Sequence, residues 1–386
     1  MEQDRNLDEG IYLDGAATTP MCAQAAEALM GAPQGNCSSE HAAGIAAAEA
    51  LEQARAQLIA RAGWPGTGIF CSGGTEANHL GLRVKGDRKV IVLAADAHAS
   101  IIAQKPMLEA QGYSVRSVAP GPDGFFTVDS LALDDSVLAL ALTSAHNLTG
   151  VVQPLTDICK RAHELGIHVH IDHVQGLCKI SPDWSHVDSA SISGHKVHGP
   201  KGIGMLLVKD AARHKPLLHG GHQEQGLRPG TTPVPLAVGF AAAADAWQEQ
   251  DTSRLAALMR SLVSGLSLRG FRVIAPETSR VAIISAVTPG IPGRVLVRAL
   301  SEQDIFISAG SACEAGSDVP GSALLASGVS AADALHAVRI SLHRFSTEAD
   351  VRTLLASLDL IVPALRQAYG AAVPDAEGPT SDGDTS

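Results

Sequence analysis

The chain alternates short apolar runs with longer amphipathic stretches through its first half. The apolar runs have the length of buried strands and predict strands near residues 89–94, 137–142, 167–172, 189–193 and 203–208. The stretches between them, for example 40–61 and 155–165, have helical spacing. Parallel strands need a crossover connection, so strands that alternate with helices favour a mostly parallel sheet. The sequence therefore predicts an α/β protein.

The pattern changes in the last third of the chain. An Ala- and Leu-rich helical stretch runs from residue 234 to about 266, and 271–275, 282–287 and 338–342 then resemble strands around two helices. We predict a large domain over 12–261 and a smaller α+β domain over 262–370, which residues 1–11 could join. Residues 373–386 are rich in Asp, Gly, Pro, Ser and Thr and predict a disordered tail.

Composition limits the partners and the compartment. The formal net charge is −11 at pH 7, and an acidic chain disfavours direct binding of nucleic acid or of an anionic membrane. No apolar run approaches the roughly 20 residues of a membrane span, and the polar N-terminus lacks the apolar core of a signal peptide. Six scattered cysteines form no disulfide framework. We therefore expect a cytoplasmic location.

One lysine has the setting of a covalent cofactor site. The segment SISGHKVHGPKGIG, residues 191–204, places Lys196 between an apolar strand and a Gly-rich turn. Burial makes an ammonium group costly, so the lysine pKa falls and the amine becomes a usable nucleophile. Enzymes that hold an aldehyde cofactor such as pyridoxal 5'-phosphate (PLP) need such a lysine. A surface lysine in a turn is the commoner case, so this hypothesis depends on the other segments.

A carboxylate follows the strand predicted upstream of this lysine. The segment IHVHIDHVQG, residues 167–176, ends its apolar alternation at Asp172 and continues to Gln175. PLP chemistry needs a carboxylate on the pyridine nitrogen, because a protonated ring is the better electron sink. Asp172 could supply it, and Gln175 could donate to the ring hydroxyl.

The same segment permits a second hypothesis. His168, His170, Asp172 and His173 spell H-x-H-x-D-H, the metal-binding string of metallo-β-lactamase-type hydrolases. Alternation places His168, His170 and Asp172 on one strand face, where imidazole and carboxylate groups could bind zinc. No further histidines and aspartates obviously complete a dinuclear site, so this zinc hydrolase ranks second.

Further segments supply candidates for binding and catalysis. Two glycines precede Thr75 at a predicted helix start, which is a site for an anion such as phosphate. His98 follows a predicted strand, where an imidazole could stack on a flat ring and move protons. Thr231 lies in the Gly-rich segment 220–233. Cys313 lies among Ser, Ala and Gly residues, and small residues of this kind favour an accessible, reactive thiol.

Together these segments resemble the cysteine desulfurases of the NifS/IscS type, which are class-V aminotransferase relatives. The resemblance runs from residue 12 to residue 347, and its motifs stand in the family order: LDGAATTP, GNCSSEHAAG, SGGTEANH, DAHAS, HNLTGVVQP, HIDHVQG, SGHKVHGPKGIG, GLRPGTTPVP, GSACEAGS and VRISLHRF. It implies fold type I of the PLP-dependent transferases, the aspartate-aminotransferase-like fold, and a homodimer.

The resemblance also implies residue roles. Lys196 would carry PLP, His98 would stack on its ring, and Cys313 would take sulfur from L-cysteine as a persulfide for an acceptor protein, leaving L-alanine. Asn147 and Arg339 would hold the substrate carboxylate region. The implied cofactor ligands are Thr75, Asn147, Asp172, Gln175, Ser193, His195, Lys196 and, from the second subunit, Thr231.

The chain departs from the family pattern at several positions. Leu148 replaces a glutamate, Gln225 replaces an arginine, and His222 and His343 replace glycines. These changes leave open the sulfur acceptor and its pathway, whether iron–sulfur assembly or thio-modification of tRNA, DNA or a natural product. The sequence as a whole also leaves open the preference between cysteine and selenocysteine. A selenocysteine lyase, or another PLP-dependent lyase or aminotransferase, is an alternative because it could spare Cys313.

Overall fold

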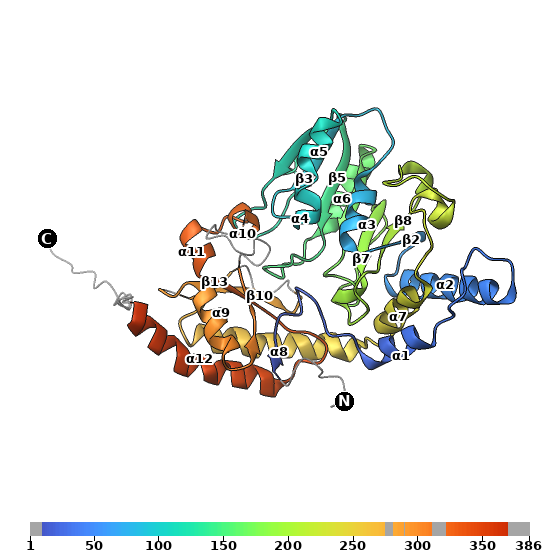
Figure 1. The fold of residues 1–386 in the computed structure, drawn as a ribbon. Helices are drawn as coiled ribbons and strands as arrows, with labels where there is room; N and C mark the ends of the chain where they lie inside the picture. The colour runs from blue at the N-terminus through green and yellow to red at the C-terminus, as the bar shows by residue number, and fades with distance from the viewer. Residues whose placement is uncertain (1–9, 275–280, 289, 311–321, 370–386) are drawn as a thin grey trace.

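The computed structural model describes residues 10–274, 281–288, 290–310 and 322–369 (Figure 1). A seven-stranded sheet with the order β2-β8-β7-β6-β5-β3-β4 forms its larger part. The pairs from β7 to β4 are all parallel, and β8 runs antiparallel to both of its neighbours. The strands are β2 (Thr67–Cys71), β3 (Val90–Ala94), β4 (Ser114–Val118), β5 (Val137–Thr143), β6 (His168–Asp172), β7 (Ser189–Ser193) and β8 (Gly204–Val208). The predicted α/β class with a mostly parallel sheet is confirmed.

Helices cover the sheet and bury its central strands. Every residue of β5, β6 and β7 is buried, as is typical of parallel strands with both faces covered. Helix α3 packs on β7 and β8, α6 packs on β6, and α7 packs on α1 and α2. The helices of this part are α1 (Ala23–Gly31), α2 (Ala42–Arg61), α3 (Gly74–Leu82), α4 (Ala99–Ile102), α5 (Lys105–Ala110), α6 (Leu155–Glu164) and α7 (Val234–Asp245).

A four-stranded antiparallel sheet, with the order β12-β13-β10-β9, forms the second part. Its strands are β9 (Arg272–Ile274), β10 (Ile283–Val287), β12 (Ser308–Ala309) and β13 (Ala337–Ser341). Helices α8 and α12 pack together beside it, the yellow and red helices of Figure 1. The helices here are α8 (Glu249–Ser267), α9 (Gly293–Ser301), α10 (Ser322–Ala326), α11 (Ala331–His336) and α12 (Glu348–Tyr369).

The start of the described chain joins this second part. Strand β1 (Ile11–Tyr12) pairs in parallel with β11 (Ile305–Phe306), and Asp14 forms a bridge with Ser341 of β13. Five residues after Asp14, the chain reaches the larger part, where Thr19 N donates to the His195 carbonyl at 2.8 Å. Helix α8 runs unbroken through residue 261, so the domain boundary proposed there stays a prediction.

The expected elements lie close to their observed positions. The five strand regions predicted in the first half correspond to β3, β5, β6, β7 and β8. The long helical stretch from residue 234 is wrong as one helix, since α7 ends at Asp245 and Gln248 starts α8 with a capping box to Asp251. None of the described helices is long and apolar enough to cross a membrane. The tail at 373–386 lies outside the described residues.

Candidate active site

Most of the predicted site residues meet in one pocket of about 320 Å³. It lies where the parallel strands β5, β6 and β7 end, the edge at which open α/β sheets bind ligands. Thr143, Asp172 and Ser193 are the last residues of these strands and line it. The candidates that the fold brings together here are Thr75, His98, Asn147, Asp172, Gln175, Ser193, His195, Lys196 and Arg339.

Lys196 ends a short 3₁₀ turn, Gly194–Lys196, that follows β7 directly. Its Nζ donates to the carbonyl oxygens of Ala16 at 2.5 Å and Ala17 at 2.7 Å. Burial and, next, the positive charge of Arg339 lower the pKa of Lys196 from 10.5 to about 7. A large fraction of the amine is therefore neutral near pH 7 and able to act as a nucleophile or base.

Asp172 is buried, and hydrogen bonds hold both of its carboxylate oxygens. Oδ2 accepts from Asn78 Nδ2 at 2.9 Å, and Oδ1 accepts from the Val174 backbone N–H at 3.0 Å. Asn78 lies on α3 three residues after Thr75, so the two side chains share one helix face. Its amide also donates to Ser100 Oγ at 2.7 Å. The carboxylate is thereby fixed in orientation within the pocket.

The histidines of the H-x-H-x-D-H string are buried and form hydrogen bonds within the protein. His168 Nε2 and His170 Nδ1 each lie 2.9 Å from Ser189 Oγ, and His170 Nε2 lies 3.0 Å from Asn78 Oδ1. Burial lowers the pKa of His170 to about 3, so the ring is neutral. Among the residues that the structure describes, no three His, Cys, Asp or Glu side chains gather as metal ligands. Of these histidines, His170 supports Asp172 through Asn78.

His98 caps the start of α4 and lines the pocket. Its Nδ1 accepts from the Ser100 backbone N–H at 3.1 Å. Burial lowers the pKa of His98 below its usual value, although Asp172 opposes the shift. The imidazole is therefore neutral near pH 7, with its proton on Nε2.

One end of the pocket is suited to an anion. Gly74 and Thr75 begin α3 there, where free backbone N–H groups favour negative charge. The Ser193 hydroxyl is buried and has no hydrogen-bond partner among the described residues. His195 lies beside it on the chain, and burial together with Lys196 lowers its pKa to about 4. A phosphate would satisfy the Ser193 hydroxyl, so this donor set fits the phosphate of PLP.

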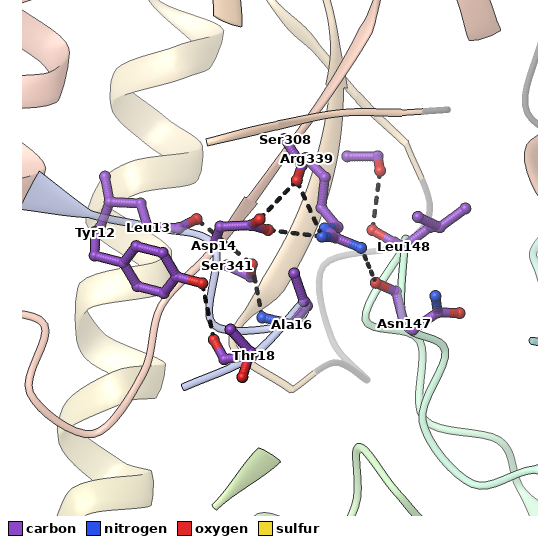
Figure 2. A network of polar contacts seen from close by, with 12 residues as sticks. Tyr12, Leu13, Asp14, Ala16, Thr18, Asn147, Leu148, Ser308, Arg339 and Ser341 are labelled. Atoms are coloured by element: carbon purple, nitrogen blue, oxygen red, sulfur yellow. Dashed lines mark hydrogen bonds and ion pairs between the residues drawn. The ribbon is translucent and has the colours of Figure 1, made fainter. Parts of the chain in front are cut away.

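The smaller sheet contributes Arg339 from β13. Its guanidinium is buried beside the larger sheet and forms an ion pair with Asp14, with Nη2 and Oδ1 2.6 Å apart (Figure 2). Nη1 donates to the Asn147 carbonyl at 3.3 Å. The pocket therefore contains an arginine next to the lysine, which suits a substrate that carries a carboxylate.

One predicted residue that the structure describes, Thr231, is not among the pocket lining. Thr231 is exposed on the loop that follows the 3₁₀ turn Gln223–Gly226. Cys313 lies outside the described residues. Asn78, Ser100 and Asp14 were missed as site residues, although Asn78 stands at helical spacing from Thr75 and Asp14 lies within the LDGAATTP motif.

The departures from the family pattern have identifiable surroundings. Leu148 is buried in an apolar cluster with Ile274, Val287 and Leu324 of the smaller part. His343 Nε2 lies 3.1 Å from the Tyr12 carbonyl, to which it can donate. Leu148 therefore replaces a charged group with apolar contact, whereas His343 adds a hydrogen bond. The other two departures, His222 and Gln225, are exposed.

A larger cavity of about 900 Å³ borders the pocket, but Lys196, Asp172 and Arg339 do not line it. Residues of α8 line one side, and Lys179 lines the other. Lys179 Nζ lies 3.3 Å from Gln175 Oε1, and burial lowers the Lys179 pKa to about 8. We place the active site in the smaller pocket because Lys196, Asp172, His98 and Arg339 converge there.

Comparison with known proteins identifies the family. The aminotransferase class-V family model matches residues 11–354. The chain is 33% identical to the IscS-like cysteine desulfurase of Mycobacterium tuberculosis, over 94% of this chain and 98% of that protein. A NifS-like protein of known structure superposes with a TM-score of 0.85 at 30% identity, covering 92% of this chain and 100% of that one.

A structure described as SspA in complex with cysteine is also similar, with a TM-score of 0.75 at 29% identity, covering 87% of this chain and 99% of that one. These matches extend over nearly the whole chain, and they favour the PLP hypothesis over the zinc hydrolase. The protein therefore belongs to the class-V aminotransferase family, in which it is a PLP-dependent cysteine desulfurase of the NifS/IscS type.

Proposed function

We propose that the protein converts L-cysteine to L-alanine, holds the released sulfur as a persulfide on Cys313 and passes it to an acceptor protein. The observation that carries this proposal is the convergence of a lysine, a fixed carboxylate and a buried arginine in one pocket. The similar SspA structure, described as a complex with cysteine, supports the choice of substrate.

The pocket residues suggest how PLP would be held. When bound, PLP supplies an aldehyde for the amine and an electron sink for the substrate carbon. Lys196 would hold it covalently, His98 would lie against its ring, and Asp172 and Gln175 would contact the ring nitrogen and hydroxyl. Thr75, Ser193 and His195 would bind its phosphate.

The remaining residues would handle the substrate. Arg339 and Asn147 would hold its carboxylate region, and the neutral amine of Lys196 would move the α-proton. The Cys313 thiolate would attack the substrate sulfur, so that an S–S bond forms while the substrate C–S bond breaks. The electron pair of the broken bond stays with the carbon skeleton, which takes up a proton and leaves as L-alanine. No external oxidant is needed, because one thiol and L-cysteine give one persulfide and L-alanine.

We further propose a homodimer in a reducing cytoplasm. The five cysteines among the described residues are free thiols, which supports a reducing compartment. Thr231 would contribute to the phosphate site of the second subunit, as its exposed position allows.

The test is a single turnover with L-cysteine, followed by mass analysis of the Cys313 peptide. We expect one added sulfur atom on that peptide and one L-alanine per site. Cys313→Ser should keep PLP, because the change removes no proposed cofactor ligand, but it should form no persulfide and lose sulfur transfer by a large factor. A serine hydroxyl cannot carry sulfane sulfur.

The alternatives give different results in the same assay. If the wild-type peptide gains no sulfur, or if Cys313→Ser desulfurates cysteine at the wild-type rate, Cys313 is not the acceptor. A selenocysteine lyase would release alanine from selenocysteine much faster than from cysteine. Borohydride should fix PLP to Lys196, and a label on Lys179 or Lys201 would contradict the site.

A further inference from the structure

Two side chains, Asp14 and Ser308, hold Arg339, the arginine proposed for the substrate carboxylate (Figure 2). Arg339 Nη2 donates to Asp14 Oδ1 at 2.6 Å and to Ser308 Oγ at 3.2 Å. Ser308 Oγ in turn donates to Asp14 Oδ2 at 2.8 Å. Asp14, Ser308 and Arg339 thus form a closed triangle of hydrogen bonds, in which the carboxylate accepts from both partners.

The backbones that carry this triangle are rigidly paired. Ser308 of β12 stands directly opposite Arg339 of β13 in the antiparallel register. The segment around Asp14 is bonded on both sides, since Leu13 N donates to the Phe306 carbonyl at 2.8 Å and Gly15 N donates to the Ser341 carbonyl at 3.0 Å. A side chain mounted on paired strands keeps its orientation better than one on a loop.

The triangle leaves part of the guanidinium without a partner. Arg339 is 2% exposed and lines the pocket, and its Nε N–H has no hydrogen-bond partner among the described residues. An unpaired buried donor costs free energy, so an acceptor is expected to approach from the pocket. A carboxylate is the acceptor that fits a fixed guanidinium best.

From this arrangement we infer that Asp14 and Ser308 are positioning residues, which aim Arg339 at the α-carboxylate and thereby select amino acids over simple amines. The inference rests on the proposed function, in which Arg339 binds the substrate carboxylate. It adds residues from β12 and from the segment that follows β1, neither of which the sequence assigned to substrate recognition.

The test compares two amines that differ only in the carboxylate. L-Alanine and ethylamine are titrated into the PLP-loaded enzyme, and binding is followed by the absorbance of the cofactor. The wild-type enzyme should prefer L-alanine. Asp14→Ala should weaken L-alanine binding roughly tenfold, as expected for one charge-assisted hydrogen bond, and should leave ethylamine binding unchanged. Ser308→Ala should act in the same direction with a smaller effect.

Conservative and matched variants separate positioning from folding. Asp14→Asn keeps an acceptor oxygen for Nη2 and should restore most of the L-alanine affinity. Asp359→Ala removes the partner of another arginine at the same distance, 2.6 Å from Arg269 Nη2, and neither of these two residues lines the pocket. It should leave both titrations unchanged.

The possible results are distinguishable. Unchanged discrimination between L-alanine and ethylamine in Asp14→Ala would overturn the inference, as would equal losses for both amines. If Asp14→Ala does not fold, wild-type discrimination in Ser308→Ala would overturn it. A wild-type enzyme that prefers L-alanine but forms no alanine from L-cysteine would contradict the proposed function while leaving the positioning role intact.

Discussion

The protonation of Lys196 decides how the apo-protein takes up its cofactor. Only the neutral amine attacks an aldehyde, and burial with the nearby Arg339 lowers the Lys196 pKa to about 7. The rate of PLP uptake should therefore rise from pH 6 and level off above about pH 8. An ordinary lysine would give a rate that still increases toward about pH 10.

The measurement is the growth of the cofactor absorbance after PLP is mixed with apo-protein at each pH. Arg339→Gln removes a charge that depresses the lysine pKa, so it should move the curve to higher pH. A wild-type rate that still rises tenfold per unit above pH 8 would show that the amine is not activated in this way.

At the scale of elements, Gly150 lies in the loop after β5 of the larger sheet, and its backbone contacts the segment that leads into β10 of the smaller sheet. It has a φ of +75°, and its carbonyl accepts from Val281 N at 2.9 Å. A Cβ at this position would collide with the carbonyl oxygen of Ile283, the first residue of β10. Gly150→Ala should therefore destabilise the protein by several kcal/mol, since the strand would have to move.

Gly112 provides the matched control for this substitution. Its φ is +85°, but an added Cβ would meet nothing within 4 Å. Gly112→Ala should cost only the strain of the left-handed conformation, about 1 to 2 kcal/mol. Denaturant unfolding of both variants gives the comparison, and equal losses would mean that the contact with Ile283 is unimportant.

Elements and site residues differ in how far the sequence predicts them. Strands such as β5 are continuous apolar runs between helices, so their positions follow from pattern alone. β2 and β4 were missed although they are as long as β3, and β4 lacks a continuous apolar run because it is partly exposed and has charged Arg116 in its centre. Asp14 could not be assigned a role from the sequence, because its partner Arg339 lies 325 residues away. Long-range pairing of this kind has no local signal.

The second-ranked zinc hypothesis depended on the spacing of His168 and His170. A metal-like spacing was present, but the structure gives these nitrogens hydrogen bonds to Ser189 and Asn78. Spacing determines which side chains share a strand face, whereas the neighbouring strand and helix determine what those side chains contact. Neighbouring elements are fixed only by the tertiary fold.

At the scale of the whole molecule, the loop that carries Thr231 is fixed at its start by Glu224, whereas Thr231 itself is exposed. Glu224 and Gln225 both adopt positive φ, +49° and +57°. Glu224 is buried, pairs with Arg55 at 2.7 Å and accepts from Phe70 N at 2.7 Å. An anchored loop with an exposed threonine is suited to contact a second subunit, as the proposed dimer requires.

Mixed dimers test this arrangement directly. One chain carries Lys196→Ala and the other carries Thr231→Ala, with different affinity tags so that the heterodimer can be purified. If Thr231 acts across the interface, one site per dimer combines both wild-type residues and should bind PLP with wild-type affinity. If it acts within its own chain, every lysine-containing site is defective, with an affinity roughly tenfold lower. A stable, active monomer would contradict the dimer itself.

The pairing of β1 with β11 also has a consequence for the order of assembly. Ribosomes make the N-terminus first, and domains begin to fold as they emerge. The seven-stranded sheet is complete in sequence at Val208, whereas the strand partner of Ile11 is Ile305. During synthesis the segment around Ile11 therefore has no strand partner until almost 300 further residues have been added. Lys196, the proposed cofactor lysine, is synthesised long before Arg339, the arginine that Asp14 holds. The cofactor-binding part of the site can therefore form earlier than the substrate-binding part.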